Sequence, residues 1–376
     1  MTPYDENDKR IIAEKAVLKA NSEDFCFQEK ASVFFSSDDC YVIVWSTNHK
    51  GCGWIEYDFE GKHYKVTDQN SGTMNTMSNI HSVRVPCRHL DNNTYKYYSR
   101  YVGIKLAYDA IQAETEISSE PVCFNGFKGG GTVRALVLSD IHGNNETAKQ
   151  AAEYFTEQPD VVFFNGDISS NIVYPEDFTS TVLKFAYEFT HGTIPIAYNR
   201  GNHETRGEFA EIMPSVFKTT TGGLFFTMKC GPLWALVLDT GEDKTDDHIE
   251  YSNLVDFSSF IAEESLWIAS LTKCDDEEIK YRVCFAHQPG VNNRYGNNWV
   301  DDISRLGCSA IICGHTHTFE IDPPASSSLP FRMLIEGGIK NEGFIATQLT
   351  FKNGNTMGIL AYDNLGNKIA DTEMIF

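Results

Sequence analysis

The second half of the chain repeats one pattern of apolar and polar positions. A short apolar run ends in Asp, Asn or His, and a polar loop and a helix-like segment follow. The run at 133–138 leads into Asp140 and His142, and the run at 161–164 leads into Asp167. Each run is too short for a typical core helix, and its continuous apolar character is typical of a parallel strand buried on both faces. Later runs of the same form lie at 194–198, 233–238, 282–286 and 310–313. The pattern predicts layered α/β architecture.

The first half has a different pattern. Strand-sized runs rich in Val, Ile, Tyr, Phe or Trp recur at roughly ten-residue spacing, which predicts a small antiparallel sandwich. These runs are ASVFF, CYVIVWST, GWIEYDF, KHYKVTD, HSVRVPC and TYKYYSRYVGIKL. The histidines of this half are scattered, and we expect surface or capping roles for them. They are His49, His63, His81 and His89.

A glycine-rich stretch at 118–131 separates the two halves. It precedes a predicted strand rather than a helix and lacks the Lys-Ser/Thr ending of a phosphate-binding loop, so we interpret it as a domain boundary. The prediction is a β-sandwich domain at 1–125 and a catalytic domain at 132–376. The tail from 331 returns to strand-like runs, which we expect to complete an outer sheet.

Composition narrows the classes of partner. The chain has 376 residues, of which 41% are hydrophobic and 22% charged, as in an ordinary soluble globular protein. The 52 acidic and 31 basic residues give a net charge of −21, which opposes binding to nucleic acid or to an anionic membrane surface. A small phosphorylated substrate is compatible with this charge, because bound divalent cations would dominate the local field.

No basic segment with a following apolar run opens the chain, and no stretch is long enough to span a bilayer, so we expect a cytoplasmic protein. The 10 cysteines include no Cys-x-x-Cys pair, which favours reduced thiols over zinc or disulfide sites.

Polar residues at the predicted strand ends form a candidate metal site. They are Asp140, His142, Asp167, Asn202, His203, His287, His315 and His317. Because ligands gather at the carboxyl ends of strands in α/β sheets, we expect these side chains to meet. Carboxylates, an amide and imidazoles suit zinc, manganese or iron better than calcium or magnesium. The candidates are too many for one ion and fit two divalent transition metal ions that share a bridging carboxylate. Each residue alone could be a cap or a core residue, but the set favours a metal site.

The order of the motifs, Asp-x-His, Gly-Asp, Gly-Asn-His-Glu, His and Gly-His-x-His, resembles that of the calcineurin-like metallophosphoesterases over residues 132–350. The resemblance implies a four-layer α/β/β/α sandwich, here preceded by the small all-β domain. It implies that His203 lies near the scissile phosphate and that Asp167 bridges the two metals. One metal would take Asp140, His142, Asp167 and His317, and the other would take Asp167, Asn202, His287 and His315.

The N-terminal half resembles the fibronectin type III-like domain of purple acid phosphatases, in the phrases VIVWST and HSVRVPCRHLDNNTYKYYSRYV. Two departures separate the chain from those enzymes. Ser170 stands three residues beyond Asp167, where they carry an iron-binding tyrosine, and His142 stands where they have no histidine. We therefore do not expect a coloured ferric-tyrosinate centre.

The expected function is that of a phosphoric ester hydrolase. A metal-bridging hydroxide would attack the phosphate ester, and His203 would assist at the phosphate or at the leaving group. Two alternatives stay open. One is a catalytically silent binding protein that keeps the fold, and the other is a nuclease on polynucleotides, which the acidic balance opposes.

Residues around the proposed centre have two interpretations each. Arg200 and Glu204 either orient His203 or form a surface pair, and Asp239 is expected to be a loop or cap residue. The loops at 169–174, 205–209, 241–251 and 290–299 are expected to govern substrate selectivity. Their aromatic residues, which either stack on a substrate or pack in the protein, are Tyr174, Tyr251, Tyr295 and Trp299.

Overall fold

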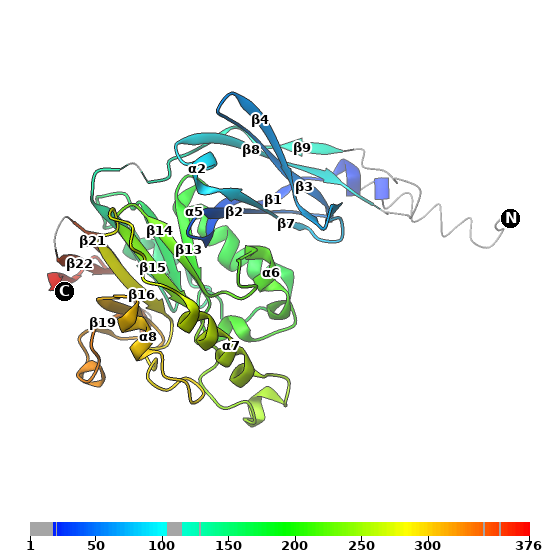
Figure 1. Ribbon diagram of the computed structural model, residues 1–376. Coiled ribbons are helices and arrows are strands. Elements are labelled where there is room, and N and C mark those ends of the chain that lie inside the picture. Colours follow the sequence, from blue (N-terminus) through cyan, green and yellow to red (C-terminus); the bar gives the residue numbers. More distant parts are fainter. Residues whose placement is uncertain (1–17, 20, 104–114, 128, 341–342, 353–354) are drawn as a thin grey trace.

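The computed structural model describes residues 18–19, 21–103, 115–127, 129–340, 343–352 and 355–376. Two large sheets lie face to face in the catalytic half, and the N-terminal strands lie at one end of them (Figure 1). Residues 1–17 and the end of the last predicted N-terminal run, 104–106, are outside the described residues. No helix in the described segments combines the length and the apolar character needed to cross a membrane.

The larger sheet has 10 strands in the order β23-β22-β21-β11-β12-β13-β1-β2-β7, with β20 beside β21. The neighbours β11, β12 and β13 run parallel, as the alternation of strands and helices predicts. The bounds are β1 (Phe27–Ser37), β2 (Cys40–Thr47), β7 (Ile80–Pro86), β11 (Val133–Leu138), β12 (Val161–Asn165), β13 (Pro195–Asn199), β20 (Gly338–Lys340), β21 (Gly343–Phe351), β22 (Thr356–Asp363) and β23 (Lys368–Ile375).

The second sheet has 6 strands in the order β14-β15-β16-β17-β19-β18. Its strands β15, β16, β17 and β19 are parallel. The bounds are β14 (Phe226–Cys230), β15 (Leu233–Leu238), β16 (Tyr281–Ala286), β17 (Ala310–Cys313), β18 (Phe319–Ile321) and β19 (Arg332–Glu336). The tail therefore supplies strands to both central sheets, and not to a separate outer sheet.

Alternate residues of the central strands face different layers. Val137 points to the core between the sheets, whereas Leu136 and Leu138 pack against helices. In the middle of the inter-sheet core the rings of Phe163 and Phe285 stack with their centroids 3.8 Å apart. Because both faces of each sheet are covered, the strands carry the continuous apolar runs seen in the sequence. The predicted four-layer sandwich is confirmed.

Helices cover the outer faces of both sheets. The 10-stranded sheet is covered by α3 (Asn145–Ala152), α4 (Pro175–Phe178), the π-helical η1 (Thr179–Leu183), α5 (Lys184–Thr190) and α6 (Met213–Phe217), and the 6-stranded sheet by α7 (Phe257–Ser270) and α8 (Val300–Arg305). Short elements in the connections are α2 (Cys87–Leu90), η2 (His203–Thr205), η3 (Phe209–Glu211), η4 (Ile249–Tyr251) and η5 (Pro324–Ser326).

The predicted all-β region at the N-terminus is present. One sheet of this sandwich is β1-β2-β7, and the other has the order β10-β8-β3-β4 with β9 beside β8. The second sheet and a small hairpin consist of β3 (Gly51–Phe59), β4 (Lys62–Thr67), β8 (Asn93–Tyr101), β9 (Glu116–Ser118), β10 (Val122–Phe124), β5 (Gln69–Asn70) and β6 (Thr73–Met74).

The sandwich is joined to the catalytic half by main-chain pairing. β1 runs parallel to β13, so β1-β2-β7 extends the 10-stranded sheet. Lys218, just after α6, adds a polar link, because its Nζ donates to Asp68 Oδ1 at 2.8 Å and to the Ser82 carbonyl at 2.7 Å. The boundary between residues 125 and 132 stays a prediction, but strands on both sides of it share one sheet.

His81 is not the surface residue that we expected. Its side chain is fully buried in the sandwich, where Nε2 lies 3.1 Å from Thr47 Oγ1 and the ring packs against Trp45. Burial lowers its pKa from 6.5 to about 4, although Asp68 opposes the shift. A buried imidazole in this environment is neutral near pH 7.

Replacing His81 with Gln should reduce the acid sensitivity of the protein. As pH falls through about 6.5, the unfolded state binds a proton that the folded state accepts only near pH 4, so stability is lost across this window. We expect wild type to lose about 2 kcal/mol more than His81→Gln between roughly pH 7 and 5, as measured by urea unfolding. His63→Gln, on the exposed β4, is the control. Equal pH profiles for wild type and His81→Gln would contradict a buried neutral imidazole.

Candidate metal centre

The predicted site residues follow neighbouring parallel strands of both sheets. Asp140 and His142 follow β11, Asp167 follows β12, and Asn202 and His203 follow β13. His287 follows β16, and His315 and His317 follow its neighbour β17. Because the carboxyl ends of these strands converge, residues up to 177 positions apart in the chain (140 to 317) meet in one place.

One group of side chains brings together Asp140, His142 and His317, whose ligand atoms lie within 4.8 Å of one another. His317 Nε2 is 3.3 Å from Asp140 Oδ1 and 3.4 Å from His142 Nε2. This carboxylate and these two imidazoles match three of the four ligands expected for the first metal.

A second group brings together Asp167, His287 and His315, again within 4.8 Å. Asp167 Oδ2 is 3.0 Å from His287 Nε2, and the side-chain oxygen of Asn202 is 3.1 Å from His315 Nδ1. These are the residues expected for the second metal. Asp167 Oδ2 also lies 3.9 Å from His142 Nε2, so this carboxylate stands between the two groups.

Five of these residues have a left-handed backbone. The φ angles are +52° at Asp140, +51° at His142, +53° at Asp167, +70° at His315 and +54° at His317. Each non-glycine residue in this region costs about 1–2 kcal/mol, and such conformations persist only where the surroundings enforce them. The sharp turns point consecutive polar side chains into one centre.

Main-chain hydrogen bonds hold these turns against each other. The Asp140 N–H donates to the Gly166 carbonyl, and the His142 N–H donates to the Asp167 carbonyl, both at 2.9 Å. The His315 N–H donates to Asp140 Oδ2 at 2.9 Å, and the His203 N–H donates to Asp167 Oδ1 at 2.9 Å. The loops of the two sheets are therefore coupled through the carboxylates themselves.

Glycines of the motifs allow close approach to the carboxylates. A Cβ atom at Gly201 would lie 2.2 Å from Asp167 Oδ1, and one at Gly314 would lie 2.6 Å from Asp140 Oδ2. Neither contact is possible for real atoms. Any side chain at these two positions would therefore clash with a ligand carboxylate, which explains the glycines of Gly-Asn-His and Gly-His-x-His.

Glu204 is not a surface residue. It holds the main chain of the loops that carry Asp167 and Gly201. Its fully buried carboxylate accepts hydrogen bonds from the main-chain N–H groups of Asp167 and Gly201, both at 2.9 Å, and of Ser169 at 2.8 Å. Burial and the charge of Asp167 raise the pKa of Glu204 to about 7. Of the two interpretations open from the sequence, the structure favours a supporting role, directed at the Asp167 loop rather than at His203.

Arg200 and Asp239 are also buried. Arg200 Nε lies 2.8 Å from Asp239 Oδ2, and the Asp239 N–H donates to the buried Glu264. The pair therefore connects the β13 loop of one sheet to the end of β15 in the other, and Asp239 is neither a simple loop residue nor one of the grouped ligands.

His203 belongs to a third group, because His142, Asp167 and His203 offer ligand atoms within 4.8 Å of one another. Its Nδ1 is 3.0 Å from the Ser170 carbonyl, and its ring meets that of His142 edge to face. Arg206 Nη1 lies 3.4 Å from both ring nitrogens of His203. Arg206 itself binds Glu242 through two hydrogen bonds, Nε to Oε1 at 2.8 Å and Nη2 to Oε2 at 3.0 Å.

The Arg206–Glu242 pair was not identified from the sequence. Glu242 is almost fully buried and also accepts from Thr205 Oγ1 and from the Tyr251 hydroxyl, each at 2.9 Å. The only sequence signal was the position of these residues in two of the selectivity loops. Nothing in the spacing of residues 206 and 242 indicates that they pair.

The aromatic residues of those loops mostly pack. Trp299 is buried with Nε1 donating to Ser265 Oγ, Tyr251 binds Glu242, and the Tyr295 hydroxyl donates to the Lys244 carbonyl at 2.7 Å. Tyr174 is exposed. Of the four aromatics, Tyr174 alone has an exposed side chain, and Tyr295 is half-buried.

The electrostatics of the centre fit bound cations. Asp140, Asp167 and His287 are buried. Burial lowers the pKa of His287, but the carboxylates of Asp167 and Asp140 outweigh it and raise that pKa to about 10. A protonated His287 imidazole thus supplies, between two buried carboxylates, the positive charge that a bound cation would supply. Within the described chain, its Nε2 has no hydrogen-bond partner in good geometry.

The imidazoles of His142 and His315 favour the neutral form that binds metal. Burial lowers the pKa of His142 and of His315 to about 4. The ring of His287 is oriented by Nδ1, which lies 2.8 Å from the Asn165 carbonyl, leaving Nε2 toward Asp167. The buried carboxylates, the neutral imidazoles of His142 and His315, and the orientation of His287 Nε2 toward Asp167 fit transition metal ions.

The comparisons with known proteins agree with this site. Residues 133–319 match the model of the calcineurin-like phosphoesterase family. The match begins at β11 and includes every predicted site residue. Together with the ligand groups it supports a metal-dependent phosphoesterase.

Solved structures of low identity are also similar to the chain. The structure of PhoD is 12% identical with a TM-score of 0.49, over 91% of this chain and 92% of that chain. A predicted phosphoesterase from Streptococcus pneumoniae TIGR4 is 10% identical with a TM-score of 0.32, over 66% and 100%. A protein serine/threonine phosphatase from Saccharomyces cerevisiae is 12% identical with a TM-score of 0.30, over 59% and 74%. No curated protein sequence matches the chain.

Replacing Gly201 with Ala should displace Asp167 and expel metal. The new methyl group would lie 2.2 Å from Asp167 Oδ1 and 2.4 Å from the Asp167 main-chain nitrogen, so the carboxylate and the loop that carries it must both move. We expect bound manganese or zinc, measured by elemental analysis after gel filtration, to fall at least about tenfold. In Gly358→Ala, the new Cβ meets nothing closer than 3.6 Å, so metal content should not change. Full metal content in Gly201→Ala would contradict the assignment of Asp167 as a ligand.

Proposed function

We propose that this protein is a dinuclear metal-dependent phosphoesterase that hydrolyses a small phosphate ester. The observation that carries the proposal is the position of Asp167 between two groups of ligands, each of which has a carboxylate and two imidazoles. The donor set favours manganese, zinc or iron. Two such ions would neutralise the phosphoryl oxygens and hold a bridging hydroxide for in-line attack.

The residues of the chain have separate roles in this proposal. Asp140, His142 and His317 would hold one ion, and His287, His315 and Asn202 the other, with Asp167 shared. His203 Nδ1 is engaged with the Ser170 carbonyl, so Nε2 is the nitrogen that can give a proton to the leaving oxygen. Arg206 packs against the same ring and keeps its orientation while Glu242 holds Arg206.

The partners and the location follow from the sequence alone. A small phosphorylated substrate, the lack of a nucleic-acid or membrane partner, and a cytoplasmic location stay predictions. The predictions about partners rest on the net charge of −21.

His203→Ala should retain metal but lose activity. Loss of a proton donor to the leaving oxygen lowers kcat by on the order of a hundredfold, with a smaller effect on KM. The measurement is steady-state hydrolysis of an aryl phosphomonoester and an aryl phosphodiester by protein loaded with manganese and, separately, with zinc. His63→Ala, an exposed histidine far along the chain, is the matched control.

Two outcomes would contradict the proposal. If the loaded wild type turns over neither ester faster than His203→Ala, the protein is a silent member of the fold. If it instead binds DNA or RNA in a strongly salt-dependent manner and cleaves it, the nuclease alternative replaces the proposal.

A further inference from the structure

An apolar cavity lies beside the loops that carry part of the candidate metal centre. It has a volume of about 380 Å³, within the range of small-molecule sites. Thr316, which stands between His315 and His317, lines it, as do Pro289 and Gly290, two and three residues after His287. The loops that carry three of the proposed ligands thus also form one side of this cavity.

Much of the remaining lining is apolar. Met333 and Ile335 of β19 line the cavity and are only 2% and 5% exposed, and Pro323, Pro324 and Leu329 form one wall. The polar residues of the lining are Asn292, Thr316, Thr318 and Glu320. The hydroxyls of Thr316 and Thr318 bind each other at 2.8 Å, so the polar groups on the ligand side are partly satisfied internally.

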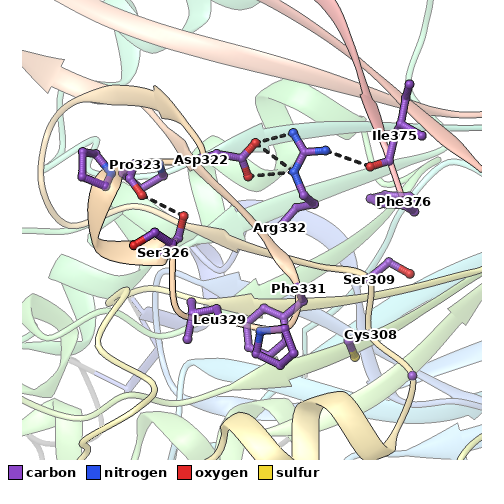
Figure 2. A pocket seen from close by; sticks show the side chains of 14 residues that line it. Cys308, Ser309, Asp322, Pro323, Ser326, Leu329, Phe331, Arg332, Ile375 and Phe376 are labelled. Atoms are coloured by element: carbon purple, nitrogen blue, oxygen red, sulfur yellow. Dashed lines mark hydrogen bonds and ion pairs between the residues drawn. The ribbon is translucent and has the colours of Figure 1, made fainter.

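The wall is anchored by the ion pair shown in Figure 2. Asp322 receives two hydrogen bonds from Arg332 Nε, and Arg332 Nη1 donates to the Ile375 carbonyl at 2.8 Å. Ser326 Oγ donates to the Pro323 carbonyl at 2.8 Å. The same loop also lines a second cavity of about 580 Å³, drawn in Figure 2. On its other side this second cavity is lined by Gly307, Cys308 and Ser309, which precede β17.

Another cavity near the centre has a different character. It has about 470 Å³ and is lined by residues 242–246 and 293–296 with Ser258. Its carboxylates already have partners, since Glu242 binds Arg206, Asp243 binds Lys244 and Asp246 binds Ser258. Part of its lining is therefore committed to the network that holds His203.

We propose that the apolar cavity binds the alcohol part of the substrate, and that the protein selects phosphate esters of apolar alcohols. This inference rests on the proposed function, because it needs the phosphate to lie at the metal centre. The loop that carries His315 and His317 places Thr316 on the cavity lining, so an alcohol chain attached to a phosphate at the metal centre would extend past this loop toward the nearly buried side chains of Met333 and Ile335. Burying a methylene there is favourable because it is removed from water.

Binding of alkylphosphonates to the metal-loaded protein tests the inference, since these compounds keep the phosphoryl oxygens and are not hydrolysed. Calorimetry with methyl- to hexylphosphonate should show affinity rising about fourfold for each added methylene until the cavity is full. The kcat/KM values of the matching alkyl phosphate monoesters should rise in parallel. Equal affinities for methyl- and hexylphosphonate would overturn the inference.

A variant whose cavity is filled by a large side chain should bind alkylphosphonates with an affinity that does not depend on chain length. The conformation of Gly290 suits other residues, and an added Cβ meets nothing closer than Arg294 Nη1 at 3.7 Å, so Gly290→Trp can place its ring in the cavity. We expect it to bind methylphosphonate normally and hexylphosphonate no better. Asn292→Trp, at the exposed rim, repeats the test with less risk to folding, and Ser327→Trp in the second cavity is the control. Unchanged chain-length dependence in both folded rim variants would also overturn the inference.

The two proposals fail in different ways. Turnover that depends on His203 but not on chain length contradicts the apolar site and leaves the phosphoesterase intact. Graded phosphonate binding without hydrolysis of any ester supports the cavity and contradicts the activity. Failure to bind any phosphonate contradicts both.

Discussion

The buried carboxylate of Asp167 is the feature on which the rest of the centre depends. Both of its oxygens are used, one accepting from the His203 main chain and the other facing His287 and His142. A buried carboxylate is tolerated only with opposite charge or hydrogen-bond donors around it, and here both are present. Glu204 fixes the main chain of the same residue from behind. Displacement of this one side chain would disturb both proposed metal positions together.

The position of Asp167 in turn depends on how the two sheets pack. Its strand lies in one sheet and His287 follows a strand of the other, so the 3.0 Å approach between them requires a rigid inter-sheet core. The stacked rings of Phe163 and Phe285 belong to these same two strands, β12 and β16. Packing of the core and geometry of the site are therefore linked through two strands, which explains why polar residues at strand ends are held to such short distances.

The sequence was sufficient to predict those parts of the fold and of the site that depend on the local pattern of apolar and polar residues. Continuous apolar runs predicted the central parallel strands, and the polar residues directly after them, such as Asp140 and His287, predicted where the site would form. The sequence was insufficient where partners are remote. The parallel pairing of β1 with β13, the Arg206–Glu242 pair and the burial of His81 each depend on contacts between segments with no shared pattern. The left-handed turns were also not predicted, because Asp and His adopt them only when the surrounding loops enforce it.

The central claim is that Asp167 is shared by two metal ions, and metal stoichiometry tests it most directly. Elemental analysis of protein saturated with manganese or zinc should give about two ions per chain for wild type and about one for His317→Ala. Asp167→Ala should hold close to none. One ion per chain or fewer in wild type, or a full ion retained in Asp167→Ala, would contradict a bridged pair and leave this chain a phosphoesterase fold without the chemistry proposed for it.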